Sequence, residues 1–381
     1  MTVAARSRQR DPLPTNRLTS AFERRVGRAL LQHVAPDAPL VVAASGGPDS
    51  TALLVASARV RAGAGVLVAA CFDHGMRPAV ETARDRAAVR ALARTLGVSA
   101  RTGATRAATP LRGEAAARVA RYRWLAGVCA DVGADACATG HTLDDQAETV
   151  LLRLTRGAGL AGAAGMAEQA SWPVAVAGKR RAAPRLLRPL LAVRRDDVLD
   201  YLDALDLDPR EDETNAVVTF DRNRVRHRVF AELRRINPRA AEQLARFATH
   251  ARNDDEALTA WALQELGAHA AFDGTTARVA REALTALPVA ISSRLLRLAA
   301  QGIGLRLERV HVEQLLALTG RRRTAVALPG GEAVTTEAWL ELRALSPVPG
   351  AGAGRRRARA AGASRELSNL MIRNELSPLD G

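Results

Sequence analysis

The sequence predicts an α/β fold, in which a doubly wound parallel sheet is followed by a smaller helical or α+β domain. From about Pro39 to Met166, short apolar runs alternate with segments of helical periodicity, as in a parallel sheet with helices on both faces. A glycine-containing loop joins the first apolar run to a helical segment, and polar motifs follow the later runs. Because such sheets bind ligands at the carboxyl ends of their strands, the sequence also predicts where the site lies.

Each element is predicted from its periodicity. Apolar runs predict strands at 40–44, 65–72 and 135–139, with a weaker candidate at 98–104. Helical spacing of apolar residues predicts helices at 49–62, 80–96, 113–132, 143–156 and 195–205. Between the last two helices we expect a Gly/Ala loop at 157–165 and a polar hairpin at 171–191.

Composition and periodicity divide the chain into four parts. A basic segment, 1–28, precedes the α/β domain, 29–228. A helical stretch with a break at Asn237-Pro238 opens the second domain, 229–345, which ends with a hairpin signal at 328–331. Residues 346–381 are rich in Gly, Pro and Arg without apolar periodicity, which predicts a mostly disordered basic tail.

The chain is strongly basic, with a formal net charge of +15 over 381 residues. Lys179 is its one lysine, so nearly all of the 55 basic residues are arginines. Arginine binds phosphates through two parallel hydrogen bonds and stacks on bases, which favours a nucleic acid as the partner. An Ala- and Arg-rich coding bias would give the same composition, so the argument depends on where the arginines lie.

The cysteines and the apolar runs indicate a cytoplasmic protein. Cys71, Cys129 and Cys137 form neither a C-x-x-C pair nor an even disulfide framework. The arginines near the N-terminus are not followed by an apolar core, so no secretory signal is expected. No apolar run approaches the roughly 20 residues that span a bilayer, so we expect no membrane contact. The oligomeric state stays open, with a homodimer as one alternative.

The loop between the first strand and the first helix of the sheet is the most informative stretch. Its residues are Ser45, Gly46, Gly47, Pro48, Asp49 and Ser50. Two glycines let the backbone approach a ligand closely, and the N–H groups that open the helix carry partial positive charge, so the loop predicts a phosphate site. It lacks the spacing and the lysine of a Walker A loop. An ordinary Gly/Ser/Pro turn is the alternative.

A second polar cluster opens the helix after the third strand. His141 follows the strand, and Asp144, Asp145 and Glu148 lie in the first turns of the helix, where Asp144 and Glu148 share a face. Carboxylates at a helix N-terminus are stabilised by the helix dipole, so a solvated cap is one interpretation. Beside a polyphosphate loop, the same acids suit Mg²⁺ held together with phosphates, or a cationic substrate.

Two more motifs bring polar residues to the expected site. His74 and Arg77 follow the second strand, where they add a hydrogen-bonding ring and a cation. Glu114 and Arg118 are spaced as a helical surface ion pair. Arg118 and Arg121 share a face, however, and could equally present two guanidinium groups to phosphates.

The border between the two domains carries mixed charge. Acidic residues and Asn215 lie at 211–215, and Arg222, Asn223 and Arg226 follow in a dense basic run. We expect a hinge surface that faces an anion, with a solvated helix start as the alternative.

Taken in order, these motifs resemble the tRNA(Ile)-lysidine synthetase family of the pyrophosphatase-loop ATPases. The loop Ser-Gly-Gly-x-Asp-Ser alone identifies the superfamily, whose members split ATP between its α and β phosphates. The family is indicated by the full set: Asp-His-Gly-Met-Arg, Glu-Ala-Ala-Ala-Arg with Arg-Tyr-Arg, Gly-His-x-x-Asp-Asp-Gln-Ala-Glu-Thr, and Arg188-Pro189-Leu190-Leu191. The likeness runs from about Leu30 to His227 and continues more weakly to about Arg343. Thr214 stands where the family usually has serine, which keeps the hydroxyl.

The resemblance implies an adenine nucleotide alpha-hydrolase-like fold and an ATP-dependent ligase. The implied reaction joins free L-lysine to C2 of the wobble cytidine, C34, of a tRNA(Ile) with the anticodon CAU. It forms lysidine through an adenylated cytidine and releases AMP and diphosphate. ATP and Mg²⁺ are then the cofactors, and the second domain is implied to bind the tRNA.

The motif chemistry and the resemblance together assign roles to individual residues. The loop 45–50 is assigned to ATP. The residues assigned to catalysis are Asp49, His74, Arg77, His141, Asp144 and Asp145. Those assigned to the substrate or the tRNA are Glu114, Arg118, Arg121, Glu148, Arg188, Asn215, Arg222, Asn223 and Arg226. Mg²⁺ is assigned to Asp49, Asp144 and Asp145, and the division between magnesium and lysine binding stays open.

Three other functions are less consistent with the sequence. A tRNA thiolase of the same superfamily would need clustered cysteines, and the three cysteines are scattered. Small-molecule amidotransferase-type ligases share the loop, but the basic second domain and the missing glutaminase domain argue against them. A non-catalytic RNA-binding protein on a decayed ATPase fold would not be expected to keep an intact loop and an acidic helix.

Overall fold

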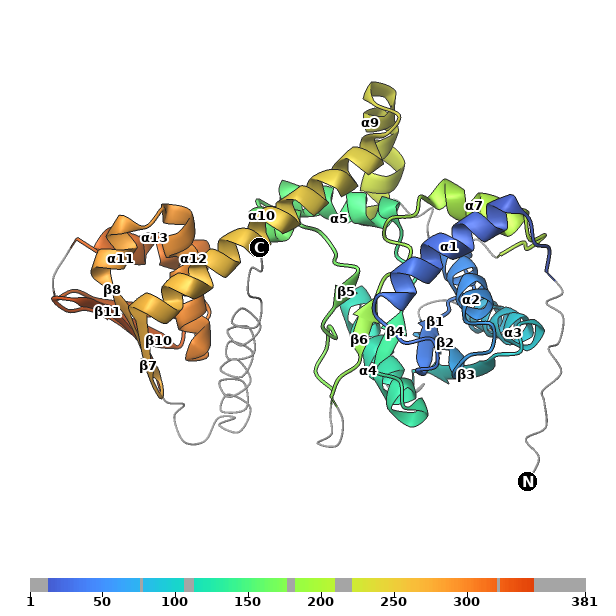
Figure 1. Cartoon of the computed structure of the whole chain (residues 1–381), viewed down its shortest axis with the longest axis horizontal. Helices are drawn as coiled ribbons and strands as arrows, with labels where there is room; N and C mark the ends of the chain where they lie inside the picture. The colour runs from blue at the N-terminus through green and yellow to red at the C-terminus, as the bar shows by residue number, and fades with distance from the viewer. Residues whose placement is uncertain are drawn as a thin grey trace, which may run out of the picture. The chain divides into compact units, whose positions relative to one another are not determined.

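The computed structural model of the chain describes residues 13–75, 78–105, 113–176, 182–209, 221–320 and 323–345. The chain divides into two compact units. The boundary between them falls between Arg252 and Asn253, inside the long helix α10 (Ala240–His269; Figure 1). Within the described ranges, no helix has both the length and the apolar character needed to cross a lipid bilayer.

The first unit is built on a six-stranded sheet with the strand order β3-β2-β1-β4-β6-β5. The strands are β1 (Leu40–Ala43), β2 (Leu67–Asp73), β3 (Ser99–Ala104), β4 (Ala136–Ala138), β5 (Gln169–Ala170) and β6 (Arg185–Leu187). Neighbouring strands are parallel except for β5, which runs antiparallel to β6. The strand order reverses between β1 and β4, which is where sheets of this kind bind ligands. The predicted doubly wound parallel sheet is confirmed.

Helices cover both faces of this sheet. The helices before the border segment are α1 (Arg17–Leu31), α2 (Pro48–Arg61), α3 (Ala79–Thr95), α4 (Glu114–Val132), α5 (Leu143–Thr155), α6 (Leu160–Ala163) and α7 (Arg195–Asp203). Alternate side chains of a strand point to opposite faces. Leu40 and Val42 therefore pack with α1, α2, α3 and α7, whereas Val41 packs against Tyr122 and Leu125 of α4.

A helical hairpin packs against α5. It consists of α8 (Asp221–Arg224), the π-helical turn η2 (Val225–Val229), α9 (Phe230–Ile236) and the start of α10. Val225, Phe230 and Ala241 bury apolar surface against Ala147 of α5. The helix breaks after Ile236, as predicted from Asn237-Pro238.

In its described residues, the second unit combines an antiparallel sheet with the end of α10 and three further helices. Its strands are β7 (Ala270–Asp273), β8 (Thr276–Ala280), β9 (Ala325–Leu328), β10 (Gly331–Thr335) and β11 (Trp339–Ala344), in the order β7-β8-β11-β10-β9. Helices α11 (Arg281–Ala286), α12 (Val289–Gly302) and α13 (Arg309–Leu318) complete it. Leu295 and Leu315 of the helices pack with Leu340 and Leu342 of β11. The smaller α+β domain and its hairpin at 328–331 are confirmed.

Two local features add to the predicted elements. The predicted basic segment 1–28 contains most of α1, which begins at Arg17, behind a capping box of Asn16 and Thr19. Phe22, Val26 and Leu30 recur at four-residue spacing on its buried face. The Gly/Ala loop at 157–165 contains the single turn α6. The tail 346–381 lies outside the described residues.

Candidate active site

The loop after β1 is shaped by two glycines and a pair of hydroxyls. Gly46 has φ +91°, a conformation that side chains with a Cβ rarely adopt. Ser50 Oγ accepts a hydrogen bond from the Ser45 N–H at 3.0 Å and donates one to the Gly47 carbonyl at 3.0 Å. Gly47 is the N-cap of α2, and no side chain caps the helix. The first N–H groups of α2 and its dipole are therefore available to an anion.

Close backbone packing brings the acidic helix next to this loop. Gly140 follows β4, and a Cβ at this position would lie 2.9 Å from the carbonyl carbon of Asp49. Only glycine therefore allows the two turns to approach so closely. Because β1 and β4 are parallel neighbours, the loop and the N-terminus of α5 lie at the same edge of the sheet.

Two arginines of the border segment bind the acids of α5. Arg222 reaches Asp145 and Glu148, each at 2.9 Å, and Arg226 reaches the same carboxylates at 3.1 and 2.6 Å. Glu148 is almost completely buried, with 2% of its side chain exposed. Asp145 also forms a capping box with Thr142, which orients the carboxylate at the start of the helix. The solvated cap is therefore only part of the role of these acids.

A third arginine joins the acids to the phosphate loop. Arg195, the first residue of α7, donates from its guanidinium to Asp49 at 3.0 Å and from its backbone N–H to Asp144 at 2.9 Å. Arg234 of α9 binds the other oxygen of Asp144 at 3.1 Å. The predicted acids thus lie together, and each of them contacts at least one arginine.

The site shifts the pKa values of three residues in different directions. Burial, with a smaller contribution from Asp145, raises the pKa of Asp49 to about 6 although Arg195 opposes the shift. Burial also tends to raise the pKa of Asp145, but the Arg222 guanidinium, the hydrogen bond from the Thr142 N–H and Arg226 outweigh it, so this carboxylate has a lowered pKa. Burial lowers the pKa of His141 to about 3. The neutral imidazole shares a hydrogen bond of 2.8 Å with the Thr139 hydroxyl through Nδ1.

Asp49 is the acid best suited to a metal ion. Its Oδ1 atom is buried without a hydrogen-bond partner, whereas Oδ2 binds Arg195. Within the described parts of the chain, no three His, Cys, Asp or Glu side chains are grouped closely enough to hold a metal by themselves. Mg²⁺ commonly takes one or two carboxylates and completes its shell with phosphates and water. The residues therefore fit a magnesium ion that is bound together with a nucleotide.

Further arginines lie beside the site. Arg118 and Arg121 stack over the buried ring of Tyr122, with guanidinium carbons 5.0 and 5.3 Å from its centroid. Arg188 follows β6 and donates to the Ala167 carbonyl at 2.6 Å, while its Nε atom is buried without a partner. Burial lowers the pKa of Arg188, and no described acid forms an ion pair with it. This cluster would be stabilised by an anion.

Comparisons with known proteins identify the family of this chain. A family model described as a PP-loop domain matches residues 18–233. The chain is 39% identical over 348 residues to a tRNA(Ile)-lysidine synthase of Salinispora tropica. The aligned region covers 86% of this chain and 96% of that protein. The chain belongs to the tRNA(Ile)-lysidine synthase family. The predicted family is thus confirmed, and its PP-loop domain includes the loop at 45–50 and the acids of α5.

Other family members differ in length. The tRNA(Ile)-lysidine synthase of Thermobifida fusca is 39% identical over 332 residues, with 81% of this chain and 93% of that protein covered. The synthase of Thermus thermophilus is 40% identical over 310 residues and covers 80% of this chain. The chain spans only 56% of the length of that relative.

The remaining predicted site residues are placed less fully. His74 directly follows β2, with its ring 6.3 Å from that of Phe72. Glu114 begins α4, and Asn223 lies in α8. Arg77 and Asn215 lie outside the described residues.

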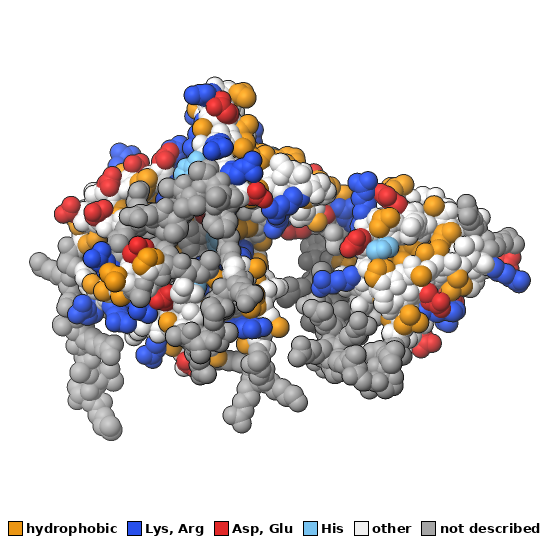
Figure 2. Space-filling view, turned by 180° about the vertical axis from the view of Figure 1, so that it is seen from behind, with side chains coloured by type: hydrophobic (Ala, Val, Ile, Leu, Met, Phe, Trp, Pro, Cys, Tyr) orange, Lys and Arg blue, Asp and Glu red, His pale blue; other side chains and the backbone are white. Residues whose placement is uncertain are grey.

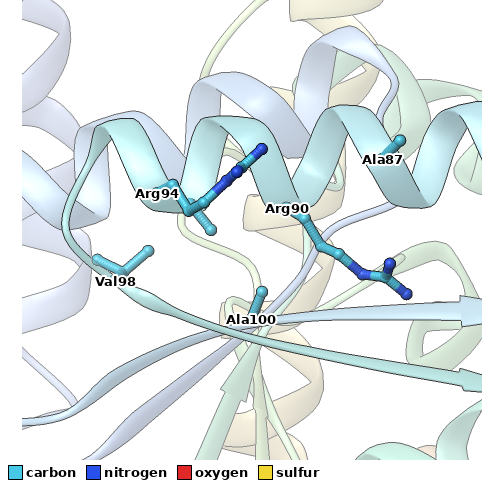
Figure 3. A pocket seen from close by; sticks show the side chains of 6 residues that line it. Ala87, Arg90, Arg94, Val98 and Ala100 are labelled. Atoms are coloured by element: carbon cyan, nitrogen blue, oxygen red, sulfur yellow. The ribbon is translucent and has the colours of Figure 1, made fainter.

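A hollow of about 470 Å³ between α3 and β3 contains none of the predicted site residues (Figure 3). Arg90 and Arg94 lie along it, and Arg90 also donates to Thr102 at 3.0 Å. Neither the loop at 45–50 nor the carboxylates of α5 line this hollow. The candidate site is therefore assigned from the chemistry of its residues and not from the presence of a cavity.

Sequence reasoning missed Arg195 and Arg234. Neither of their helices carries a motif that was assigned to the active site, and Arg195 is separated from Asp49 by 146 positions in the chain. One signal was present, because Arg194 and Arg195 stand at a helix start, where the dipole disfavours cations. A cation at such a position indicates a nearby acidic partner.

Asp49→Asn is expected to stabilise the ligand-free protein at pH 7.5 by about 2 kcal/mol. A raised folded-state pKa supplies stability that is complete below about pH 4 and is lost as the pH rises through 6. The ionised carboxylate therefore costs the native protein stability at neutral pH, and asparagine removes this cost. Denaturant unfolding of both proteins at pH 4 and pH 7.5 measures the difference. If the two proteins differ in free energy of unfolding by the same amount at pH 4 and pH 7.5, the assignment of the raised pKa to Asp49 is contradicted.

Proposed function

We propose that this chain ligates L-lysine to C2 of the wobble cytidine, C34, of tRNA(Ile) with the anticodon CAU. One observation supports this proposal most strongly. A phosphate-binding loop and the carboxylates Asp49, Asp144, Asp145 and Glu148 lie together at the carboxyl edge of the sheet. The named relatives support it as well, since they are tRNA(Ile)-lysidine synthases.

The loop and α2 would hold ATP. Its phosphates would lie against Gly46 and Gly47, where the uncapped N–H groups of α2 point toward the ligand. The C2 oxygen of the cytosine would attack the α-phosphorus, the bond to the diphosphate would break, and diphosphate would leave. Adenylation turns a poor leaving group into AMP. Mg²⁺ held by Asp49 would neutralise phosphate charge when it is bound.

The acids of α5 would receive the lysine. Its side-chain amine would attack C2, the bond between C2 and the adenylated oxygen would break, and AMP would leave. An amine with an ordinary pKa of about 10.4 must first lose a proton, which would pass to water. Arg222 and Arg226 next to Asp145 and Glu148 would favour this loss, because nearby cations lower the pKa of an ammonium group. The lowered pKa of His141 favours a hydrogen-bonding role for its neutral ring rather than proton acceptance.

The cysteines support a ligase over a thiolase. All three are buried, and burial raises the pKa of Cys71 to about 11. Sulfur transfer requires an accessible thiolate, whereas these three side chains are buried.

The partners follow from this reaction. We propose Arg118, Arg121, Arg188 and the domain 229–345 as contacts of the tRNA. ATP, tRNA and free lysine occur together in the cytoplasm, where we place the protein. A homodimer stays an alternative that sedimentation can test.

The test is ATP-dependent incorporation of radiolabelled lysine into an isoleucine tRNA transcript with the anticodon CAU. A methionine tRNA transcript with the same anticodon is the control. We expect label in the first alone. AMP formation on tRNA without incorporation would keep the adenylation chemistry but assign the nucleophile to another substrate, and no AMP would refute the proposal.

A further inference from the structure

The α9–α10 hairpin, residues 228–247, projects from the first unit next to the site (Figure 1). We propose that its tip binds the phosphate backbone of the RNA substrate, with Ile236 as an apolar contact to a base or a ribose. This proposal rests on the proposed function and specifies which surface, at the start of the domain 229–345, contacts the RNA.

Large apolar side chains are exposed on this hairpin. Ile236 is 82% exposed at the end of α9, and Val229, seven positions earlier on the same helical face, is 41% exposed. Phe247 of α10 is 43% exposed. Three exposed large apolar side chains on one short hairpin are typical of a contact surface rather than of a single scattered apolar position.

The same hairpin is basic. It contains five arginines and only two acidic residues, Glu232 and Glu242. The arginines are Arg228, Arg234, Arg235, Arg239 and Arg246. Glu232 accepts two hydrogen bonds from Arg235, at 2.9 and 3.1 Å. Glu242 forms an ion pair with Arg194 at 3.6 Å. Figure 2 shows basic side chains in blue on this projection. An excess of guanidinium groups around an apolar tip matches an anionic polymer with flat, apolar bases.

Charge also distinguishes RNA from a second copy of the chain. A symmetric dimer through this tip would place the same basic patch opposite itself. Like charges across an interface oppose association, whereas phosphates would neutralise them. RNA is therefore the better occupant.

The hairpin is coupled to the catalytic acids. Arg234 binds Asp144 at 3.1 Å, whereas the next residue, Arg235, has 77% of its side chain exposed. One side of α9 thus contacts the site while the other side faces solvent. Since a helix rises about 1.5 Å per residue, the exposed tip lies only a few ångströms along α9 from the contact with Asp144. RNA on the tip would therefore lie beside the site of adenylation.

The experiment measures binding alone. A fluorescently labelled anticodon stem–loop with a CAU loop is titrated with the full chain at several salt concentrations, without ATP or lysine. Arg235→Gln/Arg239→Gln is expected to weaken binding about tenfold and to reduce the slope of log K against log salt by about 1.5, the value for two lost phosphate contacts. Ile236→Ser is expected to weaken binding about threefold without changing the slope.

A matched control is available on the same unit. Arg94→Gln/Arg101→Gln removes the same charge from two exposed positions on α3 and β3, and we expect at most a twofold effect. The proposal is overturned if the hairpin variant and this control behave alike. It is also overturned if RNA affinity persists and the hairpin variant converts a dimer into a monomer. Failure of the unmodified chain to bind the stem–loop would instead refute the proposed function, so the two failures are distinguishable.

Discussion

Glu148→Gln is expected to destabilise the first unit by about 3 kcal/mol, the low end of the cost of breaking a buried ion pair. Glu148 has 2% of its side chain exposed and binds both Arg222 and Arg226. Glutamine keeps the shape of the side chain but removes its negative charge. Asp145 would then have to balance the two partly buried guanidinium groups of Arg222 and Arg226 without Glu148. Lysidine formation is expected to fall by at least a hundredfold, because the same arginines would lose their positions in the site.

Denaturant unfolding followed by circular dichroism measures the loss. Glu232→Gln is the matched control, because Glu232 also binds one arginine twice but has 68% of its side chain exposed. We expect less than about 0.5 kcal/mol for this variant, as for other exposed pairs. Equal losses of unfolding free energy in the two variants would show that burial does not determine how strongly Glu148 and its two arginines stabilise the unit.

Asp145→Asn is expected to raise the lysine KM at least tenfold while ATP binding is retained. Asparagine can still accept the hydrogen bond from the Thr142 N–H, so the capping box and the start of α5 should persist. The variant removes the negative charge that we propose for lysine binding. Initial rates at varied lysine and an ATP titration of the same variant separate the two effects.

Asp144→Asn is the comparison for this experiment. Asp144 lies one position earlier in the same helix turn but contacts Arg195 and Arg234 rather than Arg222 and Arg226. A lysine KM that is unchanged in Asp145→Asn would refute its lysine role. An equal rise in both variants would indicate a general loss of negative charge rather than a specific contact.

The local parts of the site could be predicted because their signals are short in sequence. Glycines between an apolar strand and a helix specify a phosphate loop, and Gly46 does adopt the conformation that glycine favours. Thr142 and Asp145 form a cap within one helical turn. For Asp144 and Glu148, the shared helix face suggested one site, but the arginines bridge Asp145 and Glu148 instead.

The sequence by itself determined the sheet, the phosphate loop, the acidic helix and the family, because each depends on a periodicity or motif within a few residues. Only the tertiary structure decided which charges meet. Arg195, Arg222 and Arg234 reach the acids across 51 to 146 positions of the chain, and no local pattern encodes such contacts. Burial, which raises the pKa of Asp49 and lowers that of His141, is likewise a property of the packed molecule, since it depends on every element that excludes water from the site.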